Sequence, residues 1–190
     1  MQMINNDYYI VRHGESENNI LEIDVSKIEN KHLYGLTEKG RGNIEKHAAN
    51  YNSFDYIFTS PLRRATETAE IFASHTKCPV IIDERLIELN FGDFDLSAYG
   101  ASGISEKQMR ADKELSQPNG ENWRQLEERI LNFYREINSK YHQKSILIVT
   151  HGVCVEILIE NLIKDFDWDA YWQNDASTRQ VFKAPSDISL

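Results

Sequence analysis

Two histidines, one near each end of the chain, occupy the same local setting. His13 and His151 each follow a short apolar run and precede a glycine, in the segments 8–14 and 146–152. Runs of β-branched and aromatic residues with little alternation are typical of strands that are buried on both faces of a parallel sheet. Ligands of such sheets bind beyond the carboxyl ends of the strands, which is where both histidines are expected. The two imidazoles could therefore converge on one crevice, and the sequence predicts a two-histidine active site.

Arginines near these positions indicate that the crevice binds an anion. Arg12 directly precedes His13, and its guanidinium matches phosphate oxygens in a forked geometry. Its charge should lower the pKa of His13 and favour neutral imidazole, the form that can attack as a nucleophile. The segment 60–69 places Arg63 and Arg64 near a predicted helix N-terminus, whose free N–H groups also favour anions. Arg63 has an acidic residue four positions later and fits a surface ion pair, which leaves Arg64 for the pocket.

The elements that must position these residues alternate along the chain. We expect strands at 8–12, 55–60, 79–82 and 145–150, and helices that begin after Thr37, at Ser60-Pro61 (to about Ser74), at 123–140 and at 153–163. This alternation predicts an α/β three-layer sandwich with a mostly parallel central sheet flanked by helices. The segment 17–36 is expected to be a loop, and 177–183 an edge strand. The polar segment 95–121 is longer than a connector needs to be, which predicts a lid-like excursion.

The composition narrows the class of protein. The 190 residues, 41% of them hydrophobic and 27% charged, fit a single domain over 1–190. A net charge of -9 argues against partners such as nucleic acid or an anionic membrane. The apolar runs are too short to span a bilayer, the N-terminus shows no secretory signal, and Cys78 and Cys154 are expected to be free thiols. We therefore expect a cytoplasmic protein, whose oligomeric state the sequence does not indicate.

Six short blocks follow one another in an order that carries a family resemblance. They are Arg12-His13-Gly14-Glu15-Ser16, Leu36-Thr37-Glu38-Lys39-Gly40, the segment 60–69, Glu88-Leu89-Asn90-Phe91-Gly92, Gly120-Glu121-Asn122 and Thr150-His151-Gly152. Each block is a weak signal, but the ordered set is specific. The chain resembles the histidine phosphatase superfamily, the phosphoglycerate-mutase-like group, in its larger, mostly bacterial branch. The resemblance implies a phosphoglycerate-mutase-like fold.

The resemblance also implies a role for each matching position. His13 would be the nucleophile that becomes a phosphohistidine. Glu88 would protonate the leaving group and later activate water. Asn19 matches the asparagine that closes the first motif and would touch phosphate. Three further residues would hold the phosphoryl oxygens and stabilise developing charge: Arg12, Arg64 and His151.

This set of groups requires no metal, and the two histidines lack the short spacing of a metal pair, so no metal or cofactor is expected. The other histidines are predicted to lie on the surface: His32, His47, His75 and His142. The sequence departs from the family pattern at two places. Asn18 stands where tryptophan is common, which should weaken packing under the loop, and Leu96 stands where glycine is often found, which should reposition the start of the lid.

Together these features predict a metal-independent phosphatase that hydrolyses a small phosphorylated metabolite through a phosphohistidine. Sugar phosphates are candidate substrates, and the family resemblance alone adds α-ribazole phosphate to them. One alternative is a phosphoglycerate mutase, and another is a non-catalytic phosphate- or phosphoprotein-binding module on the same fold. Hydrolysis is preferred because the long Phe-Thr-Gly-Trp stretch of glycolytic mutases is missing and the segment 95–121 holds only three basic residues against several acids.

Overall fold

A five-stranded sheet forms the centre of the computed structural model, which describes residues 6–163, 166 and 182–184. The strands lie in the order β3-β2-β4-β1-β5 and comprise Asp7–Arg12 (β1), Tyr56–Thr59 (β2), Val80–Ile82 (β3), Ser145–Thr150 (β4) and Phe182–Ala184 (β5). The first four run parallel, whereas β5 pairs antiparallel with β1 at the edge. The prediction of a mostly parallel sheet is confirmed. Of the predicted edge strand, residues 177–181 lie outside the described part of the chain.

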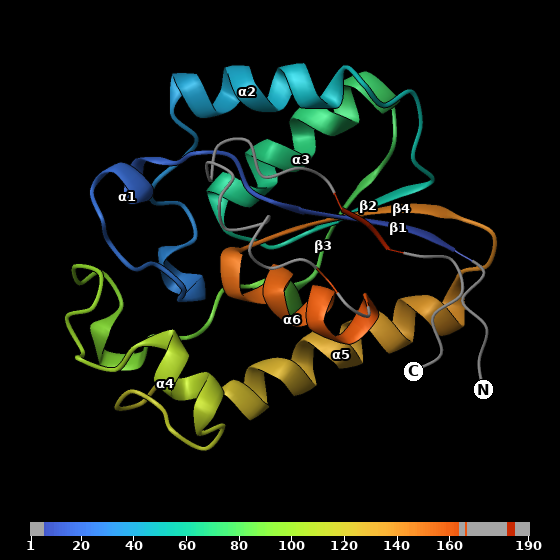
Figure 1. The fold of residues 1–190 in the computed structure, drawn as a ribbon. Helices are drawn as coiled ribbons and strands as arrows, with labels where there is room; N and C mark the ends of the chain where they lie inside the picture. The colour runs from blue at the N-terminus through green and yellow to red at the C-terminus, as the bar shows by residue number, and fades with distance from the viewer. Residues whose placement is uncertain (1–5, 164–165, 167–181, 185–190) are drawn as a thin grey trace.

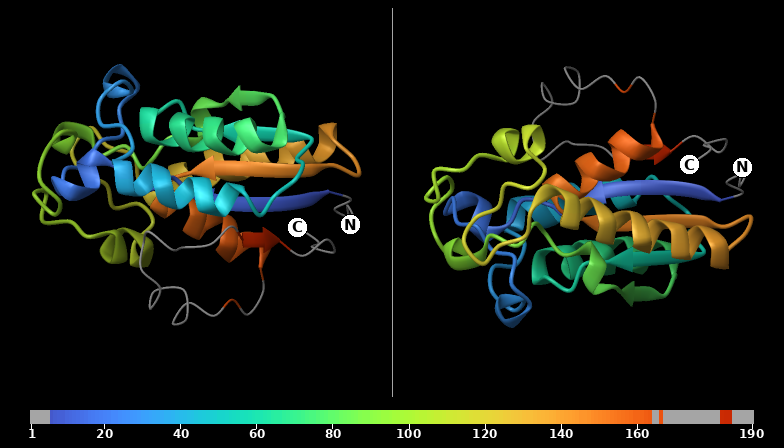
Figure 2. Two further views of the ribbon diagram at one scale, coloured as in Figure 1. Left: turned by 90° about the horizontal axis from the view of Figure 1, so that it is seen from above. Right: turned by 90° about the horizontal axis from the view of Figure 1, so that it is seen from below.

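Helices cover both faces of the sheet. Helices α2 (Glu38–Ala48) and α3 (Arg63–Thr76) lie on one face, and α5 (Trp123–Lys140) and α6 (Gly152–Leu162) lie on the other (Figures 1 and 2). The hydrophobic core therefore consists of two clusters, one on each face of the sheet. Along β4, Ile146 and Ile148 belong to the cluster with α5 and α6, whereas Leu147 and Val149 belong to the cluster with α2 and α3. Burial on both faces explains why these strands are apolar throughout, and the predicted three-layer α/β architecture is confirmed.

Capping side chains begin two of the helices at the predicted places. The Thr37 hydroxyl accepts a hydrogen bond from Gly40 N at 2.9 Å, and the Asn122 side chain accepts one from Gln125 N at 2.9 Å. The prediction that Ser60 caps α3 is wrong. That helix begins two residues later, at Arg63, and the Ser60 hydroxyl instead accepts a hydrogen bond from Leu62 N at 3.3 Å. Ser60 is thereby free to contact a histidine.

Two irregular segments meet at the end of the sheet where the parallel strands terminate. The segment 17–36, expected to be a loop, contains the short helix α1 (Glu17–Ile20) and a 3₁₀ turn at Ile28–Asn30. The segment 95–121 contains α4 (Glu106–Ala111), and further 3₁₀ turns lie at Glu84–Leu86 and Gly92–Phe94. In Figure 1 both α1 and α4 lie at the left-hand end of the molecule, next to the carboxyl ends of β1 and β4. The fold therefore surrounds the predicted crevice with these two segments.

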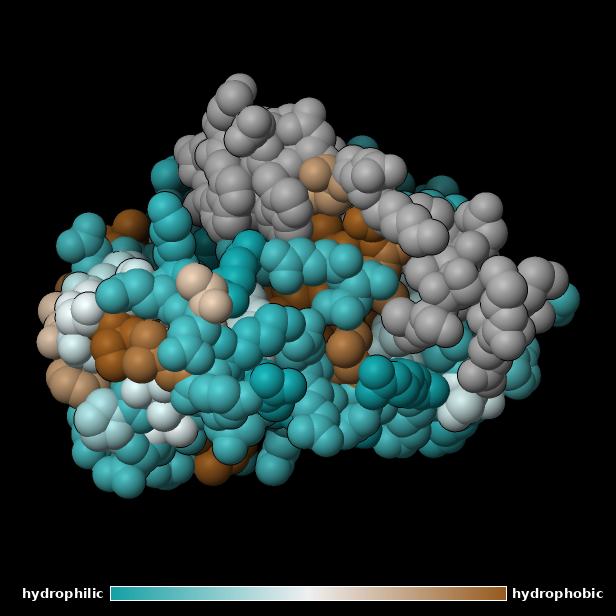
Figure 3. Space-filling model, turned by 60° about the horizontal axis from the view of Figure 1, so that its bottom comes forward, coloured by the Kyte–Doolittle hydropathy of each residue, from teal (hydrophilic) through white to brown (hydrophobic). Residues whose placement is uncertain are grey.

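The surface over α4 and α5 is largely hydrophilic, with apolar side chains in small groups (Figure 3). No helix in the described part of the chain is long and apolar enough to cross a membrane.

Candidate active site

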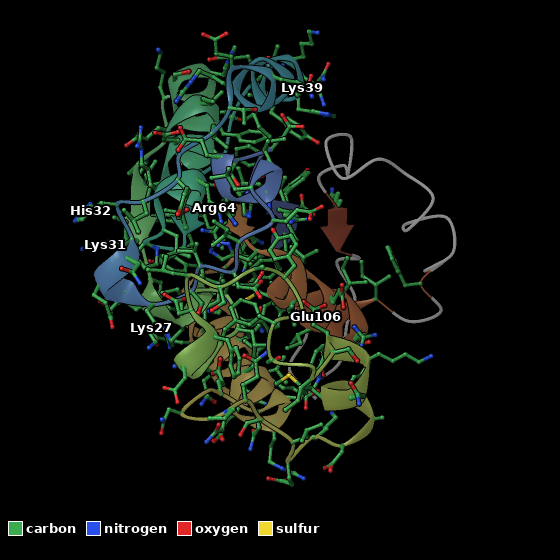
Figure 4. The ribbon with its side chains drawn as sticks, turned by 90° about the vertical axis from the view of Figure 1, so that its left-hand side faces the viewer. Lys27, Lys31, His32, Lys39, Arg64 and Glu106 are labelled. Carbon is green, nitrogen blue, oxygen red and sulfur yellow. The ribbon has the colours of Figure 1, made fainter. Side chains whose placement is uncertain are left out.

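A cavity of about 530 Å³ opens at the carboxyl end of the sheet. Five of the predicted site residues line it: Arg12, His13, Asn19, Arg64 and Glu88. Figure 4 looks at this end of the molecule and shows Arg64 near the middle of the view. The sixth residue, His151, does not line the cavity but packs behind His13. The volume is within the range of sites that hold small metabolites.

The pairing of β1 with β4 brings the two histidines together. Arg12 lies opposite Thr150 in the parallel register, and His13 N donates to the Thr150 carbonyl at 2.9 Å. The rings of His13 and His151 have centroids 5.1 Å apart and planes inclined by 61°. The expectation that both histidines converge on one place is thus met.

The hydrogen bonds of His13 assign its tautomer. Its Nδ1 lies 2.8 Å from the carbonyl oxygen of Gly14, which can only accept, so Nδ1 carries the proton. Its Nε2 accepts a hydrogen bond from Arg64 Nε at 3.1 Å and therefore holds a lone pair. Burial lowers the pKa of His13 well below its usual value, and the charges of Arg64 and Arg12 lower it further. The ring is therefore neutral, and its unprotonated nitrogen, Nε2, lies beside the cavity.

Gly14 lets this turn pack closely against α2. A Cβ at this position would lie 2.7 Å from the Ile44 side chain and 3.2 Å from the Gly40 carbonyl. Its own N–H donates to the Thr68 hydroxyl at 3.1 Å. The small residue after the histidine therefore fixes where the carbonyl that orients His13 lies.

Arg64 is almost fully buried and is oriented by the loop after α1. Its Nη2 donates to the Val25 carbonyl at 2.8 Å, whereas its Nη1 has no partner among the described residues. Burial lowers the pKa of Arg64 to about 10, against the opposite influence of Glu88. Arg12 likewise has a buried Nε with no partner in the described structure. By contrast, Arg63 pairs with Glu67 at 2.8 Å on the surface, as predicted.

Ser60 orients His151, a role that the sequence did not reveal. The Ser60 hydroxyl lies 2.7 Å from His151 Nε2 and already accepts a hydrogen bond from Leu62 N, so its own proton is available to His151. His151 Nδ1 then carries a proton, and it has no partner in the described part of the chain. Burial, followed by the charge of Arg64, lowers the pKa of His151 well below its usual value. Both histidines are therefore neutral.

Glu88 faces the cavity from the segment that follows β3. Its Oε1 accepts a hydrogen bond from Leu89 N at 2.9 Å. A Cβ on Gly152 would lie 3.9 Å from Glu88 Oε2 and 3.8 Å from Arg12 Nε, so this glycine lies beside both groups. Glu88, the predicted acid, and Arg12, a predicted phosphate-binding arginine, therefore both lie next to Gly152.

Arg129 holds the backbone that carries Glu88. Its guanidinium donates to the carbonyls of Arg85 and Ile87, at 2.7 Å each, and to the carbonyl of Glu88 at 3.0 Å. The Glu121 carboxylate accepts from its Nε and Nη2 at 2.7 and 2.8 Å. The sequence analysis did not single out this arginine. The feature of the sequence that could have revealed it is a charged residue on the apolar face of a helix, three residues after Leu126 and four before Phe133, both of which are buried.

The loop around Asn19 is internally bonded. Asn19 Oδ1 accepts from Ser16 N at 3.2 Å, and its Nδ2 donates to the Tyr99 hydroxyl at 3.0 Å. The neighbouring Asn18 was expected to weaken packing, but it is buried and donates to the Ile23 carbonyl at 3.0 Å. Hydrogen bonds therefore hold this loop in place of an aromatic ring.

Leu96, near the start of the segment 95–121, has φ +67° and donates its N–H to the Asp24 carbonyl at 2.8 Å. Glycine adopts this left-handed conformation without steric cost, whereas leucine does not.

Both cysteines are free and buried, as expected. Burial raises the pKa of the Cys154 thiol, which donates to the Ile87 carbonyl at 3.2 Å. Within the described residues no group of three histidine, cysteine or acidic side chains could hold a metal ion. Of the histidines predicted to be at the surface, His32, His75 and His142 are exposed and His47 is partly buried.

Comparison with known proteins identifies the class to which this fold and site belong. The family model described as "Histidine phosphatase superfamily (branch 1)" matches residues 8–183. The chain therefore belongs to the histidine phosphatase superfamily.

Its relatives include both phosphatases and mutases by name. It is 28% identical over 154 residues to the uncharacterized phosphatase PhoE of Bacillus subtilis, covering 80% of this chain and 75% of that one. It is 33% identical over 132 residues to a 2,3-bisphosphoglycerate-dependent phosphoglycerate mutase of Thermoplasma acidophilum, covering 64% and 61%. A crystal structure of a putative alpha-ribazole-5'-P phosphatase from Escherichia coli shares the fold, with a TM-score of 0.70 at 22% identity over 97% of this chain and 98% of that one.

Proposed function

We propose that the protein is a metal-independent phosphatase that hydrolyses a small phosphomonoester through a phosphohistidine on His13. The observation that carries this proposal is a group of buried nitrogens with no partner among the described residues: Arg12 Nε, Arg64 Nη1 and His151 Nδ1. Buried polar groups are almost always hydrogen-bonded, and an unsatisfied one costs about 1–3 kcal/mol. A phosphoryl group has the charge and the acceptors to satisfy such donors.

The reaction begins at the neutral His13 ring. Its Nε2 lone pair attacks phosphorus as the bond from phosphorus to the ester oxygen breaks. The N–H groups of Arg64 and Arg12 move to the phosphoryl oxygens and stabilise their charge. The Glu88 carboxyl gives its proton to the leaving alkoxide.

Water completes the cycle. It attacks phosphorus of the phosphohistidine, the bond from phosphorus to Nε2 breaks, and the Glu88 carboxylate takes the water proton. Inorganic phosphate leaves, and both His13 and Glu88 return to their starting protonation states. The proton on Nδ1 stays there throughout, donated in a hydrogen bond to the Gly14 carbonyl, which keeps Nε2 as the reacting nitrogen.

A mutase is not favoured by the surroundings of the cavity. In the segment 95–121 Arg110 pairs with Glu156 and Glu160, and Lys113 pairs with Glu127 at 2.7 Å. Two of the three basic residues in this segment are therefore neutralised, which leaves little charge to hold an anionic product for a second transfer. A sugar phosphate or a ribazole phosphate would fit the volume of the cavity.

The test is phosphate release from a panel of phosphomonoesters, with His13→Ala as the decisive variant and the exposed His142→Ala as its control. We expect His13→Ala to lose turnover and the acid-labile, base-stable phosphoenzyme, while His142→Ala keeps both. Hydrolysis at the wild-type rate by folded His13→Ala would refute the nucleophile. Glu88→Gln should lose more activity on alkyl esters than on p-nitrophenyl phosphate, because only the poor leaving group needs the proton.

A further inference from the structure

The cavity has two chemically different ends. Arg12, Arg64 and His13 line the end where the proposed phosphoryl transfer occurs. The rest of the lining carries carboxylates that this chemistry does not use, from the loop after α1, from α4 and from α6: Asp24, Glu106 and Glu156. These groups face the space that the leaving alcohol would occupy.

Two of these carboxylates have no ion-pair partner among the described residues, and the arginines act on them only from a distance: Arg64 on Asp24, and Arg12 and Arg110 on Glu106. Glu156 is paired with Arg110, but Asp24 and Glu106 have no side-chain hydrogen bond or ion pair within the described structure. Burial, and then the charge of Glu88, raises the pKa of Asp24 to about 6. Glu106 is an exposed residue that lines the cavity, and desolvation there, followed by the charge of Glu88, raises the pKa of its carboxyl group to about 7. Both groups would therefore gain from a nearby cation.

A buried amide at the same end also lacks a partner. Gln117 lines the cavity and is only 6% exposed, and its Oε1 has no hydrogen-bond partner among the described residues. Such an oxygen can only accept a hydrogen bond. An unused buried acceptor in the same cavity as two carboxylates without ion-pair partners indicates a ligand that donates hydrogen bonds and carries positive charge.

Apart from Arg12 and Arg64, which the proposed chemistry assigns to the phosphate, few cations line the cavity. Lys107 is the only lysine among the described lining residues, and it is exposed. Figure 4 places Lys27, Lys31 and Lys39 toward the edges of the view, whereas Arg64 and Glu106 lie near its centre. The carboxylates are also too dispersed to hold a metal ion, since no group of three metal-ligating side chains gathers in the described part of the chain. An organic cation fits this distribution better.

We infer that the leaving group of the substrate carries an amine, so that the enzyme acts on phosphomonoesters of amino alcohols. In this arrangement the phosphate lies against Arg12 and Arg64, and the ammonium group lies between the carboxylates of Asp24 and Glu106, within reach of the Gln117 oxygen. The inference rests on the proposed function, because it assigns the alcohol whose phosphate is removed. An anionic alcohol such as a glycerate would meet repulsion at this end of the cavity.

The test compares esters that differ only in the charge at the far end. ω-Aminoalkyl phosphates of about two to six carbons are assayed against alkyl phosphates and ω-carboxyalkyl phosphates of matched length. We expect kcat/KM to favour the amine about tenfold or more at the length that reaches the carboxylates, and to be lowest for the carboxylate. Glu106→Gln and Asp24→Asn should each reduce the ratio of amine to alkyl ester. Glu128→Gln, an exposed acid on α5, is the matched control and should leave that ratio unchanged.

A binding measurement separates the two proposals. ω-Aminoalkylphosphonates and alkylphosphonates resist hydrolysis, and calorimetry with the wild-type protein gives their relative affinities. Preference for the amine without hydrolysis of any ester would support the ammonium subsite and overturn the phosphatase. Hydrolysis with no preference for the amine at any length would overturn the subsite alone. Neither hydrolysis nor preferential binding would overturn both.

Discussion

Replacing His13 with asparagine should change how the stability of the protein depends on pH. The folded ring stays neutral because burial and two arginines lower its pKa well below the usual value. In the unfolded chain the same histidine titrates near pH 6.5. Below that pH the unfolded state therefore binds a proton that the folded state does not bind. The stability that His13 contributes is present above about pH 6.5 and is lost as the pH falls.

The size of the effect follows from this difference in protonation. With the folded ring neutral throughout, the free energy of unfolding falls by about 1.4 kcal/mol per pH unit below about pH 6.5. Between about pH 7.5 and pH 5 the sum is about 2 kcal/mol. Asp24 and Glu106, whose pKa values are raised, oppose this trend because they stabilise the fold at low pH and lose that contribution as the pH rises. Their effect is common to wild type and variant and largely cancels in the difference.

The assay is urea unfolding followed by tryptophan fluorescence, to which the buried Trp123 contributes, at about pH 7.5 and about pH 5. Relative to wild type, His13→Asn should be about 2 kcal/mol more stable at the lower pH than at the higher. His142→Asn is the control, since water surrounds this exposed side chain in both states, and its difference from wild type should not vary. A difference for His13→Asn that is also constant across this range would show that the folded ring takes up a proton and would refute the argument.

Five further outcomes follow from the surroundings of particular residues. Gly14→Ala should lower stability by about 1–3 kcal/mol because its Cβ meets Ile44 at 2.7 Å, whereas Gly42→Ala, with open space around it on α2, should raise stability by up to about 1 kcal/mol; thermal melts compare them. Arg129→Gln strips three carbonyls and a carboxylate of their partner, so stability should fall by about 3 kcal/mol and kcat should fall more than KM changes. Leu96→Gly removes a left-handed leucine and should be neutral or stabilising by up to about 1 kcal/mol, while Leu96→Val should be destabilising.

The preference for amine esters should also depend on pH. Asp24 and Glu106 have raised pKa values of about 6 and 7, so both carry less charge at about pH 5 than at about pH 8. The groups that act on them are Glu88, Asp95 and Arg64 for Asp24, and Glu88, Asp24, Arg12 and Arg110 for Glu106. The ratio of kcat/KM for amine and alkyl esters should rise through this range. A ratio that is flat or falls would contradict the assignment of these two carboxylates.

Much of the fold could be predicted because its signals are local. The bounds of α5 and β4 agree with the prediction at both ends, since the helical spacing of apolar residues in the first and the apolar run in the second are contained in the segments themselves. The start of α3 was misplaced for the opposite reason. Ser60 has the local features of a cap, but its hydroxyl is engaged by a histidine 91 residues away in the sequence.

The sequence by itself determined the chemistry available to this protein. Histidines at the ends of two apolar runs had to meet once β1 and β4 paired in parallel, and an arginine before the first of them had to lie beside it. Only the tertiary structure decided which nitrogen of His13 lacks a proton. The Gly14 carbonyl accepts the proton of Nδ1, and Arg64 of α3 donates to Nε2, so Nε2 keeps its lone pair. The tertiary structure also placed Arg129 under Glu88 and gathered Asp24, Glu106 and Gln117 around one cavity. These residues come from separate segments whose spacing carries no common pattern. Their surroundings in the folded protein raise the pKa values of Asp24 and Glu106 and leave the Gln117 Oε1 without a partner among the described residues.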